Sequence, residues 1–392
     1  MTIPIAAADI TPCGTPPRMR VCTGLSCALA GGCDLLAQLE QLAQPAPLRP
    51  TSGAGWCVEA AACLGRCDGA PAVLAGARPV TGADADAVLA AVAAGPAPHT
   101  GHIDYDAYRA AGGYRLLRAC TEWRFHPESV IVMLMASGLR GLGGGGQPTG
   151  RKWRAARNAP APRLLAVAAG AAPPGTFKDR HYLEHDPHRF LEGAFVAAWA
   201  VGIDTIRVTV RPDYPELAAM LADELARVLA DPPVPDLPHV VLDCADAAAA
   251  ADAETETPPT LVHNLETLYW VRDILERGAE WFAARGKRGR RGLRSLSVSG
   301  RVRAPGVKLV PAGTTMRELL DGHCGGMQDG HAFYAYLPGG EGGTVLPAAL
   351  ADVPLDFDTL ERHGGSFGAG AIVVLSDRDA ACAAALGLAP ES

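Results

Sequence analysis

Residues 164–180, LLAVAAGAAPPGTFKDR, indicate the fold of the central part of the chain. The first half is apolar and suits a buried strand, and the second half turns abruptly into the charged run KDR. Residues 186–203, DPHRFLEGAFVAAWAVGI, then suit a helix, and residues 203–210, IDTIRVTV, suit the next strand. A strand that runs into a helix often delivers cofactor-binding groups at the junction. The stretch therefore predicts an α/β unit with a candidate site at the end of its first strand.

The composition is that of an ordinary folded protein. The chain has 392 residues, of which 48% are hydrophobic and 20% charged, so we expect two or three domains. The net charge of −7 argues against a general nucleic-acid binder. The apolar stretch VIVMLMASGL, residues 130–139, is too short to cross a membrane. The N-terminus shows no basic segment followed by an apolar one, so we expect a cytoplasmic protein.

Four of the eleven cysteines form two close pairs. Cys22 and Cys27 lie in VCTGLSC, and Cys63 and Cys67 lie in CLGRC. In a reducing compartment, clustered cysteines more often bind metal than form disulfides. Two thiolate pairs suit the two tetrahedral irons of a 2Fe–2S cluster, and the glycines beside them let backbone N–H groups approach the sulfurs. A structural zinc site and four unrelated thiols are the alternatives, although zinc more often takes C-x2-C pairs.

The same segments carry a family resemblance. VCTGLSCALAGG, followed after a long insert by CLGRCDGAP, resembles the thioredoxin-like 2Fe–2S ferredoxin subunit of respiratory complex I. The resemblance covers residues 18–97 and implies that the four paired cysteines are the cluster ligands. A Pro/Gly-rich linker at residues 93–102 predicts a domain boundary. The other cysteines are expected to be structural or incidental, namely Cys13, Cys33, Cys57, Cys120, Cys244, Cys324 and Cys382.

A glycine-rich loop, SGLRGLGGGGQPTGRKW, occupies residues 137–153. It fits G-x-G-x-x-G but follows a predicted helix rather than a strand, so the motif alone is weak. Together with PPGTFKDRHYLEHDPHRFLEG and PTLVHNLETL, it resembles the NADH-binding flavoprotein subunit of complex I, a module shared with NAD-dependent formate dehydrogenases and NAD-reducing hydrogenases. The matches run in order across residues 104–376. The resemblance implies a residual FMN or nucleotide site at Gly141, Gly143, Gly144, Gly146, Lys152 and Asn264.

Several positions that bind the flavin and the nicotinamide nucleotide in that family carry different residues here. Before PGTFKDR the family has an Asn and several acidic residues, whereas this chain has Ala168, Gly170, Ala171 and Pro173. A Gly-Glu-Glu-Thr run of the family is replaced by the low-complexity segment DAAAAADAETETPP, residues 246–259. The side chains of Ala, Gly and Pro cannot accept hydrogen bonds from ribityl hydroxyls. We therefore expect FMN and NAD binding to be impaired.

The C-terminal part resembles the soluble-ligand-binding β-grasp domain of the same flavoprotein subunit. Residues 294–376 contain alternating strand-like segments and a short helix that is expected to begin near Thr315. The family then continues into a helical bundle with a 4Fe–4S cluster, whereas residues 377–392 are a short tail here. Cys324 and Cys382 cannot supply four ligands, so we expect no 4Fe–4S cluster.

The sequence thus predicts a multidomain α/β and α+β protein. We expect a thioredoxin-like ferredoxin domain at residues 18–97, a shortened Rossmann-like flavoprotein α/β domain at 104–285 and a β-grasp domain at 294–376. The resemblance implies an iron–sulfur electron-transfer subunit of an NADH dehydrogenase-type or formate dehydrogenase-type complex, with other redox subunits as partners. An active FMN-dependent NADH:acceptor diaphorase subunit and a non-catalytic assembly or interaction protein are the alternatives.

Overall fold

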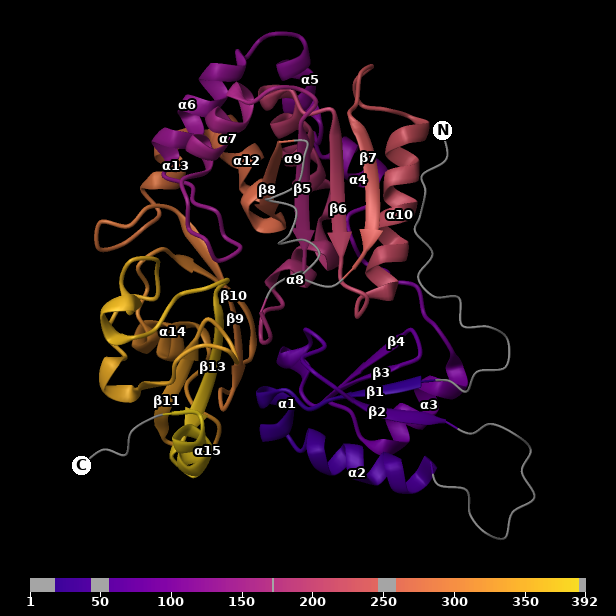
Figure 1. Cartoon of the computed structure of the whole chain (residues 1–392), viewed down its shortest axis with the longest axis vertical. Helices are drawn as coiled ribbons and strands as arrows, with labels where there is room; N and C mark the ends of the chain where they lie inside the picture. The colour runs from indigo at the N-terminus through magenta and orange to yellow at the C-terminus, as the bar shows by residue number, and fades with distance from the viewer. Residues whose placement is uncertain (1–17, 44–55, 171–172, 246–258, 388–392) are drawn as a thin grey trace.

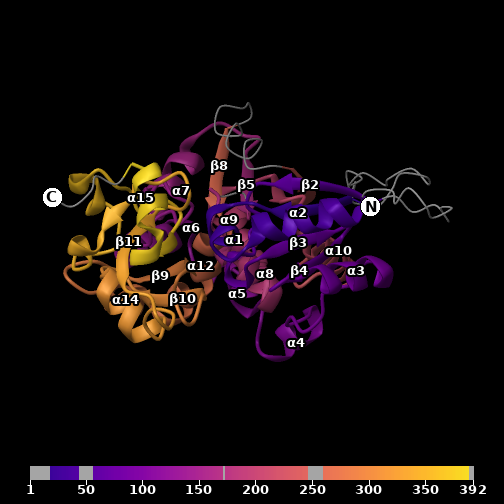
Figure 2. The same ribbon diagram turned by 90° about the horizontal axis from the view of Figure 1, so that it is seen from below.

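The computed structural model of the chain describes residues 18–43, 56–170, 173–245 and 259–387. The described elements form three separate sheets, each with helices of its own (Figure 1). In the view from below, the C-terminal part lies to one side of the N-terminal and central parts (Figure 2). No helix among these residues is both long enough and apolar enough to cross a membrane.

The N-terminal part is a four-stranded mixed sheet with three helices. Strand β1 pairs in parallel with β2 and antiparallel with β3, which is the arrangement expected of a thioredoxin-like domain. Leu35 and Leu39 of α2 and Val88 of α3 bury their side chains against β1. The sheet order is β2–β1–β3–β4, and the elements are β1 (Arg18–Cys22), α1 (Leu25–Leu29), α2 (Gly32–Ala43), β2 (Cys57–Ala61), the 3-10 turn η1 (Cys67–Gly69), β3 (Ala72–Ala75), β4 (Arg78–Thr81) and α3 (Ala85–Ala94).

The central part is an α/β unit on a fully parallel sheet, as residues 164–210 predicted. The sheet order is β7–β6–β5–β8, so the carboxyl ends of all four strands meet at one edge. In Figure 1 the strands β6 and β7 point toward the N-terminal part. The elements are β5 (Leu164–Ala169), α8 (Lys178–His185), α9 (Pro187–Val201), β6 (Thr205–Val210), α10 (Pro215–Ala230), β7 (His239–Cys244), β8 (Thr260–Asn264), α12 (Leu265–Arg277) and α13 (Ala279–Ala283).

Helix α9 is the buried centre of this unit, and its ends follow from its sequence. Asp186 accepts a hydrogen bond from the backbone of Arg189, Pro187 occupies the first turn, and Gly202 ends the helix with a φ of +77°. An added Cβ at Gly193 would lie 2.0 Å from the carbonyl oxygen of Leu268 in α12. The two helices therefore cross closely because position 193 has no side chain.

The helices before the sheet differ from the expectation in one place. Residues 103–119, IDYDAYRAAGGYRLLRA, have an amphipathic pattern that predicts one helix, but they form α4 (Tyr105–Ala110) and α5 (Arg115–Thr121). The chain breaks there because Gly112 and Tyr114 both take positive φ angles, +90° and +60°. The glycine-rich loop connects α6 (Pro127–Ser137) to α7 (Thr149–Asn158), so it follows a helix, as predicted.

The C-terminal part is a five-stranded sheet in the order β10–β9–β13–β11–β12. Its central pair, β9 and β13, is parallel, and the other pairs are antiparallel. Thr315 caps α14 and forms a capping box with Glu318, which fits the expected helix start. The elements are β9 (Leu293–Gly300), β10 (Gly306–Pro311), α14 (Met316–His323), β11 (Phe333–Pro338), β12 (Leu346–Pro347), β13 (Ala371–Ser376) and α15 (Ala380–Ala385).

Candidate functional site

The two cysteine pairs predicted from the sequence meet at one buried place. Cys22 ends β1, Cys27 lies in α1, Cys63 follows β2 and Cys67 begins η1. All four are buried, with exposed fractions of 1–3%. The Sγ atoms of Cys63 and Cys67 lie 3.2 Å apart, and the thiol of Cys22 contacts both Cys27 and Cys63. The sheet and the first helix thus bring together four sulfurs that are up to 45 residues apart in the sequence.

Backbone N–H groups surround these sulfurs. The N–H groups of Gly65 and Gly175 donate to the Sγ of Cys63, with N···S distances of 3.3 and 3.2 Å. Hydrogen bonds from the thiols of Cys22 and Cys67, followed by these two N–H groups, lower the pKa of Cys63 and favour its thiolate. Four buried thiols that face one another, with N–H donors around them, fit a 2Fe–2S cluster.

The central part of the chain covers the sulfur site from outside the ferredoxin-like sheet. The side chain of Phe177 packs against Cys63 and Cys67 in one apolar cluster, beside the amide of Gly175. An added Cβ at Gly65 would lie 1.8 Å from the hydroxyl of Tyr214, and Gly65 has a φ of +67°. A glycine is therefore required at position 65, where the loop between Cys63 and Cys67 meets the central part.

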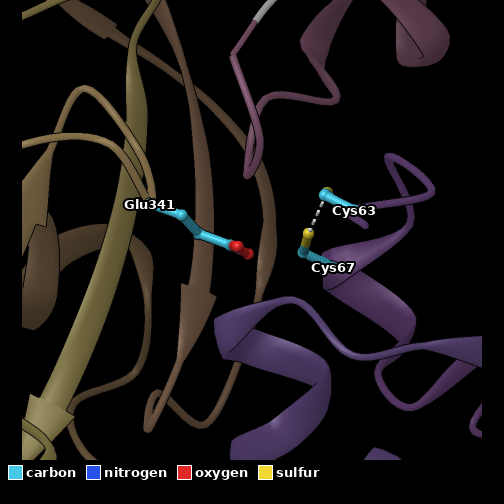
Figure 3. Close-up of side chains that lie close together, drawn as sticks. All are labelled: Cys63, Cys67 and Glu341. Atoms are coloured by element: carbon cyan, nitrogen blue, oxygen red, sulfur yellow. Dashed lines mark hydrogen bonds between the residues drawn. The ribbon is translucent and has the colours of Figure 1, made fainter. Parts of the chain in front are cut away.

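The C-terminal part contributes a carboxylate, that of Glu341. One carboxylate oxygen and the Sγ atoms of Cys63 and Cys67 all lie within 4.8 Å of one another. The side chain reaches across from the loop between β11 and β12 and points toward the two cysteines (Figure 3). Burial, followed by the charge of Cys63, raises the pKa of Glu341. No sequence motif marks this residue, because it lies in a glycine-rich turn far from the cysteines.

The glycine-rich loop of the predicted FMN site uses several of its N–H groups within the protein. The N–H of Gly141 donates to the carbonyl of Gln147 at 2.8 Å, and the N–H of Gly146 donates back to Gly141 at 3.2 Å. The N–H of Leu142 donates to the hydroxyl of Thr267 at 2.9 Å. These groups close a turn between α6 and α7, and they face protein acceptors where a phosphate would need them free.

The glycines of this loop also pack tightly against other parts of the chain. An added Cβ at Gly143 would lie 2.9 Å from the Cβ of Asn264, and one at Gly146 would lie 2.6 Å from the ring of Phe357. Gly144, with a φ of +119°, faces the backbone of the C-terminal part. The structure thus brings the backbone of Gly143 and the side chain of Asn264 close together.

Asn264 belongs to a buried group of charges at the carboxyl ends of β5 and β8. The ammonium of Lys178 contacts Asp179 at 2.9 Å, Asn264 at 2.8 Å and Glu266 at 3.0 Å. The amide of Asn264 donates to Asp179 at 2.6 Å, and the N–H of Gly170 donates to the same carboxylate at 3.2 Å. Burial lowers the pKa of Lys178, but Asp179 and Glu266 outweigh it and raise that pKa.

Lys152 lies apart from this charged group. Its ammonium donates to the carbonyl of Val262 in β8 at 2.8 Å. It also lines a cavity of about 580 Å³ that runs between α7 and the start of β8, with a lining that includes neither Asn264 nor the glycines of the loop. Some positions that differ from the flavoprotein family lie outside the described residues, namely Ala171 and nearly all of residues 246–259.

Comparisons with known proteins agree with the three-part architecture. Residues 9–94 match the thioredoxin-like [2Fe-2S] ferredoxin family, residues 134–233 the Nuo51 FMN-binding domain and residues 296–347 the SLBB domain. The crystal structure of an NAD⁺-reducing [NiFe]-hydrogenase in the air-oxidized state superposes with a TM-score of 0.74 at 26% identity, over 93% of this chain and 70% of that chain. The predicted fold class and the resemblance are confirmed.

Curated relatives are similar over most of their length. An F-type subunit of the NADH-quinone oxidoreductase of Rhizobium meliloti is 32% identical over 310 residues, which are 71% of this chain and 73% of the relative. The corresponding protein of Aquifex aeolicus is 30% identical over 316 residues, 72% of each chain. That of Escherichia coli is 31% identical over 297 residues, 67% of this chain and 66% of the relative. The chain therefore belongs to the family of NADH-quinone oxidoreductase F-type subunits.

Proposed function

We propose that this chain is the iron–sulfur electron-transfer subunit of an NADH dehydrogenase-type or formate dehydrogenase-type complex, and that its FMN/NADH site is impaired. The observation that carries the proposal is the convergence of four buried thiols where the three parts of the chain meet. A 2Fe–2S cluster bound to Cys22, Cys27, Cys63 and Cys67 would accept and release one electron at a time.

The residues around the thiols have distinct tasks in this proposal. The N–H groups of Gly65 and Gly175 stabilise negative charge on the sulfurs. Phe177 and Val307 exclude water on the side away from the ferredoxin-like sheet. The remaining cysteines of the described residues lie on separate elements, among them α5, β7 and α15, so we propose no 4Fe–4S site.

The impaired flavin site rests on the use of its polar groups within the protein. Asn264 binds Lys178 and Asp179, and the N–H groups of Gly141 and Gly146 bind protein carbonyls. A ribityl chain and a flavin ring need partners of their own, and Ala168 and Gly170 offer no side-chain acceptor. These features support impaired FMN binding, so no step is assigned to a flavin or to NAD.

The proposed partners are other subunits of a redox complex in the cytoplasm. The relatives are subunits of NADH-quinone oxidoreductase, and the hydrogenase neighbour is NAD⁺-reducing. With impaired nucleotide binding, a partner must supply and remove the electrons. The net charge of −7 argues against nucleic acid as a partner.

The test is the visible spectrum and metal content of the whole chain, purified without oxygen. We expect two irons and two acid-labile sulfides per chain, with no stoichiometric flavin. Stoichiometric zinc in place of iron would overturn the proposal. The match of residues 134–233 to an FMN-binding domain keeps the diaphorase alternative. Tightly bound FMN with rapid NADH–ferricyanide turnover would establish it, and a chain that binds no metal would favour the assembly protein.

A further inference from the structure

We infer that the carboxylate of Glu341 lowers the reduction potential of the cluster held by the four cysteines. The inference rests on the proposed function, and it concerns a residue from a different domain than the ligands. Figure 3 shows the carboxylate facing the sulfurs of Cys63 and Cys67 across the junction between the N-terminal and C-terminal parts.

The backbone around Glu341 fixes this position. Gly339 and Gly340 take φ angles of +86° and +88°, so the chain turns sharply at the end of β11. The N–H of Glu341 then donates to the carbonyl of Pro174 at 3.2 Å. Pro174 immediately precedes Gly175, whose own N–H donates to the Sγ of Cys63. The loop that presents the carboxylate is therefore attached to the loop that presents a hydrogen-bond donor to the same sulfur.

No cation neutralises the carboxylate within the described residues. The Oε1 atom of Glu341 is buried and has no hydrogen-bond partner among these residues. The carboxylate accepts a hydrogen bond from the backbone of Leu25, which acts to lower its pKa. The oxygens lie against Gly24, where an added Cβ would be 2.7 Å from Oε1. The side chain is thus enclosed between the first cysteine loop and the second cysteine pair, where its charge is poorly screened.

Two opposite effects then act at Cys63. Hydrogen bonds from Gly65 and Gly175 stabilise additional negative charge on the sulfur and raise the reduction potential. A carboxylate oxygen within 4.8 Å of the sulfur opposes the arrival of one more electron and lowers the potential. The net charge around a cluster is among the main determinants of its potential. The loop of Gly175, which donates a hydrogen bond, and the loop of Glu341, which supplies a carboxylate, therefore act together on the reduction potential of the cluster. Both loops lie outside the domain that holds the cysteines.

The test is a redox titration of the whole chain, followed by the electron paramagnetic resonance signal of the reduced cluster. At a fixed ambient potential near the midpoint, Glu341→Gln is expected to raise the ratio of reduced to oxidised cluster about tenfold, which is about 59 mV for one electron. Glu341→Asp keeps the charge at a greater distance and should fall between the wild type and Gln. Glu40→Gln removes the same charge at an exposed position of α2 and should leave the ratio unchanged.

A second variant keeps the inference testable if Glu341→Gln loses the cluster. Gly24 has a φ of −59°, which suits alanine, so Gly24→Ala displaces the carboxylate without neutralising it. The ratio should again rise, by less than in Glu341→Gln. Iron-loaded Glu341→Gln or Gly24→Ala protein with an unchanged ratio would overturn the inference and leave the proposed function intact. Wild-type protein without a 2Fe–2S signal would overturn both.

Discussion

The cysteine site and the glycine-rich loop differ in what their polar groups face. At the cysteine site, four sulfurs face one another, and N–H groups from two parts of the chain point at them. At the glycine-rich loop, the N–H groups of Gly141, Leu142 and Gly146 and the side chain of Asn264 bind atoms of the protein itself. A binding site is recognised by the donors that remain for a ligand, and a motif alone does not show this. Substitutions in the two regions can break or sharpen that contrast.

The largest expected effect is the loss of the cluster on removal of one sulfur. Cys63→Ser should abolish the visible absorption and the acid-labile sulfide, because Cys63 receives both N–H donors and contacts two other thiols. Cys57→Ser is the matched control, since Cys57 is exposed and lies outside the pairs. Equal iron and sulfide contents in the two variants would show that the cluster ligands have been assigned wrongly.

The next effect concerns flavin affinity. Each missing hydrogen bond to a buried polar group costs about 1–3 kcal/mol. Three or four such losses at the end of β5 and in residues 246–259 should weaken FMN binding by several powers of ten. Fluorescence titration with FMN, followed by an NADH–ferricyanide assay, measures this. Submicromolar affinity with rapid turnover would mean that other groups rebuild the site, and the contrast between the two regions would disappear.

A smaller effect is expected from the buried charges beside Asn264. Lys178→Met would remove the cation that contacts Asp179 and Glu266, each of which is 1% exposed. The free energy of unfolding should fall by about 3–5 kcal/mol, as measured by urea denaturation. Lys287→Met is the control, because Lys287 forms an exposed pair with Glu318 and should cost less than about 1 kcal/mol. Similar losses in both variants would contradict a structural role for the buried group.

The smallest effect separates packing from ligand binding at the loop. Gly146→Ala places a Cβ 2.6 Å from Phe357 at a φ of +57°, and it should lower the free energy of unfolding by about 1–3 kcal/mol. Gly145→Ala meets no atom within 4 Å and should cost much less. If both variants keep wild-type stability but lose an FMN affinity that the wild type has, the loop is a phosphate site after all.

The sequence predicted the parts of the molecule that depend on short-range pattern. These parts are the two close cysteine pairs, the strand β5 and the start of α14 at Thr315. Each depends on residues only a few positions apart, so it can be inferred from the local sequence. The break between α4 and α5 is not predicted by the amphipathic pattern, because that pattern continues across Gly112. The helical backbone stops there, since Gly112 and Tyr114 have positive φ angles.

The sequence pattern does not predict contacts between residues that are far apart in the chain. Gly175 and Glu341 lie beside the sulfurs only because the three parts of the chain pack around one junction. A glycine or a glutamate in a turn does not by itself predict a contact with distant cysteines. In the same way, the glycine-rich loop has the composition of a phosphate cradle, but its packing against Phe357 depends on residues more than 200 positions away. The domain boundaries, the role of the four paired cysteines as cluster ligands and the roles of the glycines, Lys152 and Asn264 remain predictions.

The covering of the sulfur site by later segments has a consequence for biosynthesis. The four paired cysteines emerge from the ribosome first, and the roughly 270 residues between Cys67 and Glu341 take on the order of half a minute to translate at about 5–20 residues per second. During that interval the thiols lack the cover that Phe177 and the Glu341 loop later provide. Iron and sulfide donors therefore have a period of open access on the nascent chain, which ends when the C-terminal sheet docks.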